Sequence, residues 1–560
     1  RSKLDYLAGF SRFDTSNAIE DDRYHDATSI ANAGYEMGGT QARFTLRNSV
    51  SASGIPGAYD FSQLVNDARQ GDQDLYMTGT LENRTPGDWH NVVRYGVARK
   101  REQQTTFSQE GFPVTATEFN YQDLYYIGNV VTIRGANGYS ATGAAILGEE
   151  GTSFPDRTDQ VNNNDEFQYL TDYRFGRHFA AFGGFHYDHE RGAFYEFQPF
   201  FSIVDNVDRT NFDYTANFQG DVKNRLFFSI GTGVEKDHLF GIRETPRFGL
   251  AWYPRRPGGG KFQGTKLRLS FSKAVQDADI FSQLDSLKSL VAQYDPNPSD
   301  ANGVPPIGPQ TTRTYEGGVD QSLIGQKLLV KATFFHNEYT GQVEFVGVNA
   351  LSGPPFNIPS NEVLALDNSF IDGAYVNTLA YRAMGSELEL EYRPLANLFI
   401  RGGYTYLDAV TQNSYASSTL APTFNPSIPG VAIGATSPLV GARPFRRPPH
   451  TGYFSITYAE KKWVVGLTSA MVSRSDDSTF LASSAYRGAS TNADNSLLLP
   501  NRDLDFGYMK LDANATYQFN PTLAFFGQVD NLLNNQHMGP IGFPSMPANF
   551  RLGVKVRFGL

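Results

Sequence analysis

An alternation of apolar and polar residues recurs along this chain, and it constrains the fold more than any other feature. In the last segment, FRLGVKVRFGL (550–560), small or cationic residues alternate with the apolar residues Leu552, Val554, Val556, Phe558 and Leu560. Successive side chains of a β-strand point to opposite faces, so this segment has one apolar face and one polar face. The same pattern predicts strands at 3–13, 385–394, 398–408, 452–458 and 523–531.

The composition favours strands and tight turns over helices. Aromatic residues make up 14% of the 560 residues, and 54 residues are glycine. No run of about 18 apolar residues is present and the mean hydropathy is -0.39, so the sequence predicts no transmembrane helix. A membrane β-barrel is compatible with this result, because each of its strands shows only about ten residues of alternating pattern.

Charge, cysteine content and motifs argue against several other kinds of protein. The formal net charge of -10 argues against nucleic acid as a partner. The chain has no Cys, so neither a disulfide framework nor a thiolate metal site is available. It also has no G-x-S-x-G, H-E-x-x-H or P-loop motif, so the sequence predicts that the protein is not an enzyme.

The connections between the predicted strands alternate between short and long. Short turns are expected near 35–42, 84–89, 174–179, 220–225, 323–327, 393–397, 459–463 and 519–522, and long polar loops near 50–73, 148–165, 273–311, 346–380, 408–449, 474–504 and 532–549. An up-and-down barrel in the outer membrane has short periplasmic turns and long extracellular loops. We therefore predict an all-β fold, a large antiparallel transmembrane barrel of about 20 to 22 strands.

One segment leaves the strand count open. In 124–147, Asn137-Gly138 is typical of a type I′ hairpin turn. This hairpin is either a pair of membrane strands or an excursion within an extracellular loop. Both choices give an even number of strands.

Residues 1–560 are predicted to form a single barrel domain. The chain begins with Arg1, without a Met or a secretory signal before the first predicted strand, which suggests a mature or trimmed fragment. A barrel this wide has a lumen that side chains do not fill, and the largest outer-membrane barrels are plugged. No segment reads as a separate globular plug, so a plug is expected upstream or on another chain.

Several segments, in this order, resemble the barrel of TonB-dependent outer-membrane receptors. They are TPRFGLAWYP (245–254), KLRLSFSKAVQDADIFSQL (266–284), the stretches 314–345 and 383–409, RPFRRPPHTGYFSITY (443–458), and 525–558 with its VDNLLN motif. The chain departs from the family in ending on Leu560 rather than Phe, and it carries neither the plug nor the TonB box. Its first segment resembles the family's third strand, which implies that two barrel strands lie outside these residues.

The candidate ligand-binding residues fall in two groups. His186, Asp188 and Glu190 share one face of a predicted strand, with Tyr187 facing lipid, and are candidates for a cation or a metal chelate. The alternative is a solvated barrel wall. Arg443, Arg446 and Arg447 precede a strand after a Pro-rich loop, where they would attract an anionic ligand, bind lipopolysaccharide phosphate, or simply anchor the strand.

Two further polar groups are predicted to have structural or metal-binding roles. Glu387, Glu389 and Glu391 are predicted to face the lumen, where they would pair with Arg401 on the next strand. They are also candidates for contact with a docked plug. The Asp-rich stretch 156–167, taken as an extracellular loop, offers oxygen ligands for Ca²⁺, although it lacks the EF-hand spacing. No other metal and no organic cofactor is indicated.

The resemblance implies a receptor in the outer membrane of a Gram-negative bacterium. Such a receptor takes up a scarce nutrient, such as a metal chelate, cobalamin, an oligosaccharide or a peptide, with energy from TonB. Its partners would be outer-membrane lipid and lipopolysaccharide, the plug domain, TonB through an N-terminal segment, and the nutrient. The alternatives are a plug-less passive diffusion channel and a structural barrel component of an envelope assembly. The sequence does not distinguish the nutrients, because receptors for them differ in loops that follow no readable code.

Overall fold

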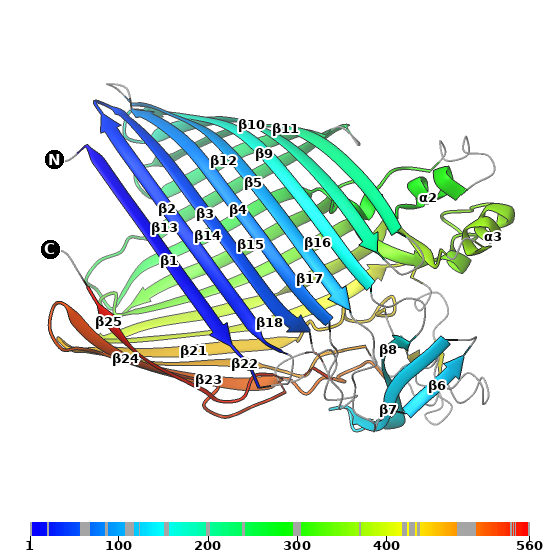
Figure 1. The fold of residues 1–560 in the computed structure, drawn as a ribbon. Coiled ribbons are helices and arrows are strands. Elements are labelled where there is room, and N and C mark those ends of the chain that lie inside the picture. The colour runs from blue at the N-terminus through cyan, green and yellow to red at the C-terminus, as the bar shows by residue number, and fades with distance from the viewer. Residues whose placement is uncertain are drawn as a thin grey trace.

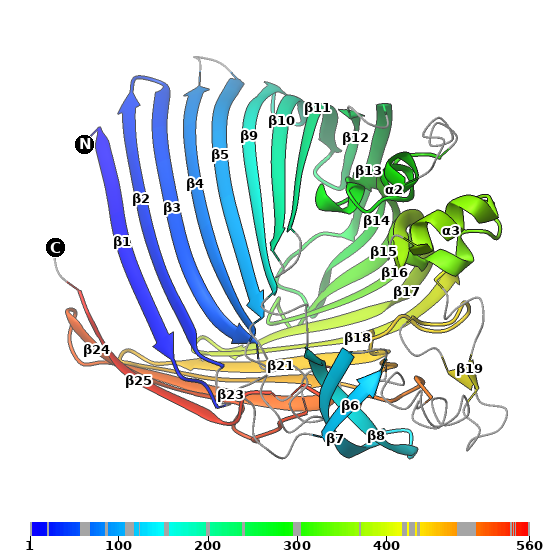
Figure 2. The same cartoon turned by 45° about the vertical axis from the view of Figure 1, so that its right-hand side comes forward.

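The computed structural model contains one large antiparallel sheet of twenty strands that curves into a barrel (Figures 1 and 2). It describes residues 3–557 except 19–21, 56–67, 85–87, 107–116, 122–123, 151–155, 198–201, 238–240, 295–303, 369–370, 417–422, 425–431, 434–436, 479–499, 538–539, 541 and 544. The strands are β1 (Leu4–Thr15), β2 (Tyr24–Met37), β3 (Thr40–Ile55), β4 (Ala68–Arg84), β5 (Trp89–Thr106), β9 (Asp156–Phe175), β10 (Phe179–Phe197), β11 (Ser202–Val222), β12 (Leu226–Asp237), β13 (Gly241–Arg255), β14 (Phe262–Gln276), β15 (Gln310–Leu323), β16 (Leu328–Gly347), β17 (Gly373–Leu395), β18 (Leu398–Asn413), β21 (His450–Ala459), β22 (Trp463–Val472), β23 (Tyr508–Gln518), β24 (Leu523–Asp530) and β25 (Asn549–Val556).

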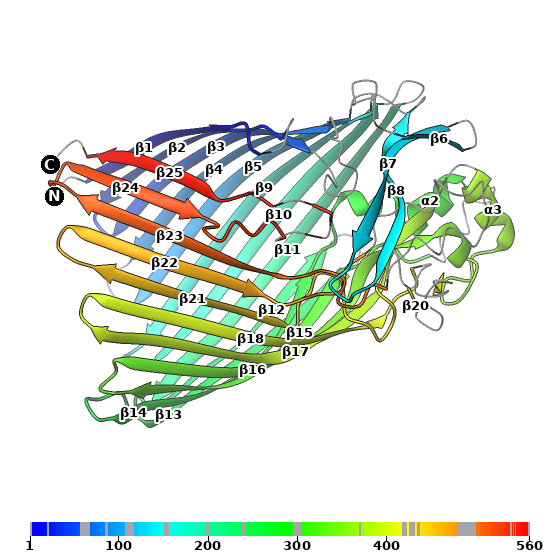
Figure 3. The same ribbon diagram turned by 90° about the horizontal axis from the view of Figure 1, so that it is seen from below.

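Each of these strands pairs with the one before it in this series, including β5 with β9 and β18 with β21. This up-and-down order confirms the predicted fold class, and twenty strands lie within the predicted range. β1 and β25 lie at the two edges of the sheet (Figures 2 and 3), and no pairing joins them among the described residues.

The alternating pattern places apolar side chains on the outside of the barrel. On β17, Leu388 and Leu390 are exposed, whereas Glu387, Glu389 and Glu391, which alternate with them, face the lumen. On β25, the exposed large apolar residues are Phe550, Leu552, Val554 and Val556. Phe558 and Leu560 lie outside the described residues. The even-numbered face of the last strand therefore meets lipid, as the sequence predicts.

The short turns lie where the sequence predicts them, but several strands begin before the expected ends of the long loops. β4 begins at Ala68, β9 at Asp156 and β17 at Gly373, each inside a stretch taken as a loop. The Asp-rich stretch 156–167 is therefore a strand and not a loop. The first residues of β4 and β9 are polar on both faces, so hydropathy does not separate them from loop sequence. The first residues of β17 are different, because Ala374 and Val376 pack in the buried apolar cluster of the long connections.

The hairpin at 124–147 is an excursion from the barrel. β6 (Thr117–Tyr121), β7 (Leu124–Arg134) and β8 (Ser140–Glu150) form a separate three-stranded sheet in the connection between β5 and β9. The predicted type I′ turn is wrong in detail. Gly138 has a φ of 89°, whereas Asn137 has no positive φ, and Gly135 N donates to Tyr139 O, as in a three-residue loop closed by glycine.

The packed apolar cluster of the protein lies in the long connections, not inside the barrel. The helices α2 (Leu287–Tyr294) and α3 (Ser360–Asn368) project beyond the strands at one end of the barrel (Figure 1). Their apolar residues pack with the ends of β16 and β17 in a cluster that includes Leu287, Leu290, Val291, Val346, Leu351, Leu366 and Val376. In the described part of the chain, no helix is long and apolar enough to cross a membrane.

Candidate functional site

The lumen face of β9 to β12 carries a dense group of charged side chains toward the long-loop end. Strand pairing sets Asp188 opposite Glu166 and Asn211, Glu190 opposite Asn164 and Arg209, and Asp213 opposite Glu235. These pairs lie on one face because no register shift interrupts the pairing. Carboxylates dominate the group, with Arg209 and His186 as its basic members.

His186 lies at the edge of a recess in this wall. Its Nδ1 lies 3.1 Å from Asp213 Oδ2, and its Nε2 lies 3.6 Å from Glu166 Oε2. Below it, Gly184 and Gly233 leave the wall without side chains, and the resulting cavity of about 330 Å³ also reaches Glu235. The recess therefore presents carboxylates and an imidazole beside two glycines that are covered by the hydroxyl groups of Thr215 and Thr245.

Arg209 ties this wall to the long connection that follows β14. Its guanidinium pairs with Glu190 and donates from Nη1 to Ala278 O at 2.8 Å, and its Nε lies 3.9 Å from Asp277 Oδ2. Asn211 Nδ2 donates to the same Asp277 oxygen at 2.6 Å. Burial raises the pKa of the Asp277 carboxyl, and the nearby Arg209 guanidinium opposes that shift. Sequence reasoning missed Arg209, because its partners lie on other strands and in a distant loop.

The structure places the three predicted residues of β10 together on the lumen face. Tyr187 lies on the opposite face and packs against Phe212, as expected for a lipid-facing residue. Glu190 accepts from Asn162 Nδ2 at 2.6 Å in addition to its pair with Arg209. No group of three metal-ligating side chains occurs in the ranges that the structure describes. A ligand-binding role for His186, Asp188 and Glu190 stays a prediction.

The glutamates of β17 have a different partner from the one expected. Lys331 Nζ on β16 lies 3.0 Å from both Glu389 Oε2 and Glu391 Oε1. Arg401 on β18 is opposite Glu391 in register, but its guanidinium lies over the Tyr453 ring, 5.7 Å from the centroid. Glu389 and Glu391 therefore each form an ion pair with Lys331 of β16, on the side of β17 away from Arg401. Their contact with a plug, like that of Glu387, stays a prediction.

Two of the three predicted arginines before β21 are engaged by buried carboxylates. Arg443 Nη1 lies 3.4 Å from Asp476 Oδ1, and Arg446 Nε lies 3.0 Å from Asp477 Oδ1. Asp476 is 2% exposed and Asp477 is fully buried, and burial raises the pKa of Asp476. Arg447 is exposed and donates to the Arg446 carbonyl oxygen. The geometry supports the anchoring interpretation for Arg443 and Arg446 and leaves Arg447 as the candidate for an anion.

The carboxylates of the Asp-rich stretch are also engaged by arginines. Asp159 accepts from Arg157 at 2.8 Å and from Gln103 at 2.7 Å, and Asp165 accepts from Arg99 and Arg191, both at 2.7 Å. Calcium at either carboxylate would have to displace a guanidinium. The predicted Ca²⁺ site is therefore not preformed at these positions.

The tip of the β7–β8 hairpin docks on the connection between β22 and β23. Ala136 N donates to Leu504 O at 2.9 Å, and Asn137 Nδ2 donates to Pro500 O at 3.0 Å and to Arg502 O at 2.8 Å. Leu504 is 1% exposed, and a Cβ added at Gly135 would lie 2.5 Å from its Cδ1. The connection after β5 thus reaches another part of the rim at the long-loop end of the barrel.

Replacing Asn137 with aspartate is expected to undock this hairpin. The variant keeps the side-chain oxygen that accepts from Tyr139 N. It replaces the amide nitrogen, which donates to the carbonyl oxygens of Pro500 and Arg502, with an oxygen that can only accept. Amide exchange at 134–140 and 500–507, followed by mass spectrometry, should rise about tenfold or more. Asn520→Asp is the matched control, because Asn520 Oδ1 accepts two backbone N–H groups in a short turn. Equal exchange in the two variants and the native protein would show that Asn137 does not hold the hairpin.

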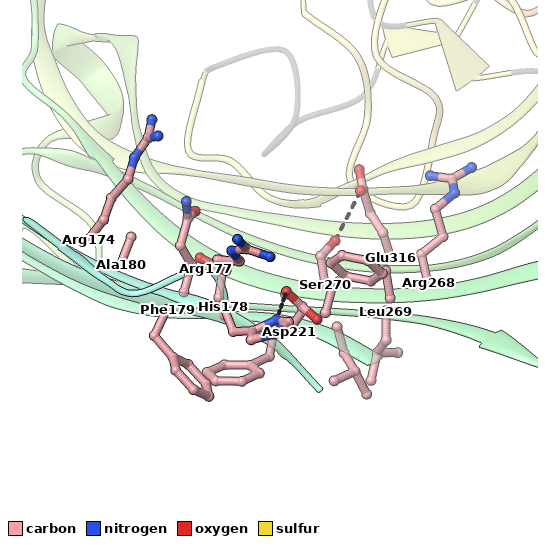
Figure 4. A pocket seen from close by; sticks show the side chains of 18 of the residues that line it. Arg174, Arg177, His178, Phe179, Ala180, Asp221, Arg268, Leu269, Ser270 and Glu316 are labelled. Atoms are coloured by element: carbon pink, nitrogen blue, oxygen red, sulfur yellow. Dashed lines mark hydrogen bonds and ion pairs between the residues drawn. The ribbon is translucent and has the colours of Figure 1, made fainter. Parts of the chain in front are cut away.

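A second cavity lies in the lumen wall near the short-turn ends of β10 to β15 (Figure 4). It has a volume of about 850 Å³, and small residues such as Gly249, Ala251 and Gly318 form its floor. Figure 4 shows Arg268 and Glu316 on the opposite side of the wall from Phe179 and Leu269, with Ser270 Oγ donating to Glu316 at 3.1 Å. This cavity is therefore a shallow depression in the lumen wall, with Arg174, Arg177, Arg268 and Glu316 among its charged lining residues.

Comparison with known proteins agrees with this architecture. The family described as "TonB dependent receptor-like, beta-barrel" matches residues 6–532. Similar solved structures include the copper transporter OprC (TM-score 0.61, 12% identity, 99% of this chain and 76% of that chain) and the ferric-catecholate import receptor Fiu from K12 E. coli (TM-score 0.62, 12% identity, 99% and 78%). Another is the unliganded ferric citrate transporter FecA (TM-score 0.60, 12% identity, 99% and 73%).

At these identities the solved structures show the fold alone, and a search of curated protein sequences finds no match. The family match, in contrast, spans most of the chain. The chain therefore belongs to the TonB-dependent receptor β-barrel family, whose members are receptors and transporters of the outer membrane of Gram-negative bacteria and not enzymes.

Proposed function

We propose that the protein takes up a scarce nutrient across the outer membrane with energy relayed by TonB. The observation that carries the proposal is the family match over residues 6–532. The wide barrel with a polar lumen wall agrees with it, because a barrel of this size leaves an interior that its own side chains do not fill.

The lumen wall favours a nutrient that carries positive charge. Glu166, Asp213 and Glu235 surround the recess beside His186, and Asp277 lies close to the same wall. A surface on which one sign of charge predominates raises the local concentration of ligands of the opposite sign, and carboxylates outnumber Arg209 and His186 on the lumen face of β9 to β12. A cationic metal chelate fits this surface better than a strongly anionic one.

The proposal includes a plug domain and a TonB contact supplied by residues outside this sequence. Two lumen surfaces suit a removable plug: the 850 Å³ hollow over β10 to β15 and the charged row with Glu387, Glu389 and Glu391. Both present mainly backbone, small residues and charged groups, with Phe227 as an aromatic residue in the hollow, and neither surface is a continuous apolar patch.

The test is uptake by cells that carry the complete gene, compared with cells that carry a deletion. The probes are iron, copper, cobalt and zinc in spent growth medium, counted in washed cells by elemental mass spectrometry, with and without a protonophore that collapses the inner-membrane gradient. Accumulation of one element that requires the gene and stops with the protonophore supports the proposal. Accumulation that requires the gene and continues with the protonophore contradicts TonB coupling and favours a passive channel. No gene-dependent accumulation contradicts a metal-bearing nutrient.

A further inference from the structure

The outer wall of β5, β9, β10 and β11 changes from aromatic to charged within two rows of residues. The pairing of these strands is continuous, so residues directly opposite one another form rows across all four. The aromatic row is Tyr95, Phe167, Tyr187 and Phe212. The next row toward the long loops is Val97, Asp165, His189 and Thr210, and the one beyond it is Arg99, Asn163, Arg191 and Asp208.

The change from aromatic to charged residues lies at the height expected for a membrane surface. Trp89, which packs edge-on against Tyr173, marks the aromatic girdle at the short-turn end. Arg99 is ten residues farther along β5, or about 33 Å along the strand. At a tilt of about 40° this is about 25 Å in height, which matches the apolar band of an outer-membrane barrel. Arg99 and Arg191 therefore lie at the outer headgroup level.

The two guanidinium groups converge on one carboxylate. Arg99 Nη2 and Arg191 Nη2 each lie 2.7 Å from an oxygen of Asp165. Arg99 Nη1 also donates to the carbonyl oxygens of Ala98 and Asn164, at 2.8 and 2.9 Å, so the guanidinium of Arg99 is held in place. Among the described residues, the Arg191 side chain donates only to Asp165, and its other N–H groups remain available on the outer face. His189 pairs separately with Asp208 at 2.9 Å.

More arginines extend the cationic surface toward the long loops. Arg101 lies beyond Arg99 on the same face and contacts Asp159 at 3.4 Å, and Arg157 contacts the same carboxylate at 2.8 Å. Arg99, Arg101, Arg157 and Arg191 outnumber the carboxylates Asp159, Asp165 and Asp208 on this face. A net positive surface is unusual for a chain with a net charge of -10.

We propose that this surface, defined by Arg99, Arg101 and Arg191, binds the phosphate group of an outer-leaflet lipid. Guanidinium groups match phosphate with paired N–H donors. The aromatic row below them would receive the acyl chains of the same lipid, since aromatic side chains prefer the membrane interface. A free phosphate ion would use the donors but not the aromatic row, so the location favours a lipid.

The test measures retention of bisphosphorylated lipid A by the purified protein in detergent, using native mass spectrometry. Arg99→Gln with Arg191→Gln is expected to retain the lipid about tenfold less than the native protein. The charge-matched control is Arg94→Gln with Lys100→Gln, on the same strand but on the lumen face, where Arg94 contacts Gln168 and Lys100 lies over Tyr76. The control should retain the lipid as the native protein does.

The second probes separate the source of the phosphate. Dephosphorylated lipid A should not be retained, and inorganic phosphate should not displace bound lipid A. Equal retention of both lipids, displacement by inorganic phosphate, or unchanged retention in the Arg99/Arg191 variant would each overturn the proposal. Heat-dependent electrophoretic mobility checks that each barrel is folded. If the double variant does not fold, Arg101→Gln replaces it, because the one side-chain hydrogen bond of Arg101 to the described residues is a long contact with Asp159. Unchanged retention in that variant would equally overturn the proposal.

Discussion

Replacing Arg209 with alanine is expected to lower the free energy of unfolding of the barrel by about 3–5 kcal/mol. Arg209 is 7% exposed, and it is the cation that lies between Glu190 and Asp277. Without it, both carboxylates stay in a poorly solvated wall with Glu235 nearby, and the Ala278 carbonyl oxygen loses its donor. The cost is the desolvation of unpaired charge, which exceeds the net worth of the ion pair itself.

The measurement is the urea unfolding midpoint of the protein folded into lipid vesicles, followed by tryptophan fluorescence. Arg247→Ala serves as the control, because Arg247 is an exposed arginine on β13 that also faces the lumen. Adding Glu190→Gln to the Arg209→Ala variant should recover part of the loss, since it removes one of the unpaired charges. An equal, small change of the unfolding midpoint in Arg209→Ala and Arg247→Ala would contradict the prediction. It would show that water solvates Glu190 and Asp277 when Arg209 is removed.

The sequence was sufficient to predict the fold because a barrel wall repeats one local rule. Each strand needs an apolar face toward lipid and a polar face toward the lumen. The residue types of Leu388 and Glu389 therefore predict which face each occupies, without information from distant residues. The short turns follow from local turn chemistry in the same way. Gly38, with a φ of 63°, lies in the predicted turn between β2 and β3.

The candidate site was less predictable because its partners are distant in the chain. Arg209 and Ala278 are 69 residues apart, and Asn137 and Arg502 are 365 residues apart. Strand pairing and loop docking create these contacts, and no local pattern encodes them. The same reason explains why Lys331, rather than Arg401, pairs with the β17 glutamates, since both neighbouring strands offered a cation at the right register.

The boundaries of the long loops were misjudged for a different reason. Beyond the membrane, a strand meets water on both faces and needs no apolar residue, so the alternation that reveals it within the band ends. The first residues of β9 show this directly, because Arg157, Asp159 and Asp165 face outward yet form ion pairs along regular strands. In such strands, cross-strand ion pairs replace the apolar pattern as the local signal.

Replacing Ile230 with arginine is expected to destabilise the barrel by about 2–4 kcal/mol, because its side chain faces the middle of the lipid layer. Ile230 is 55% exposed and lies between Phe218 and Phe248 on the neighbouring strands. It is four residues beyond Leu226, where β12 begins after a short turn, or about 13 Å along the strand. Near the centre of the apolar band, a guanidinium reaches the headgroups only by distorting the bilayer.

The matched variant is Gly249→Arg, on the strand next to β12 but on the lumen face. A Cβ at Gly249 would lie 4.0 Å from Ser229 Cβ, an ordinary contact, and the longer side chain would extend into the 850 Å³ hollow. Its expected effect on the free energy of unfolding is within about 1 kcal/mol, because water solvates the lumen. Urea unfolding of both variants in vesicles tests which face meets lipid at this height. Similar losses at the two positions would mean that both faces are packed there, and the polar wall of β12 and β13 would then have to be covered by another part of the protein.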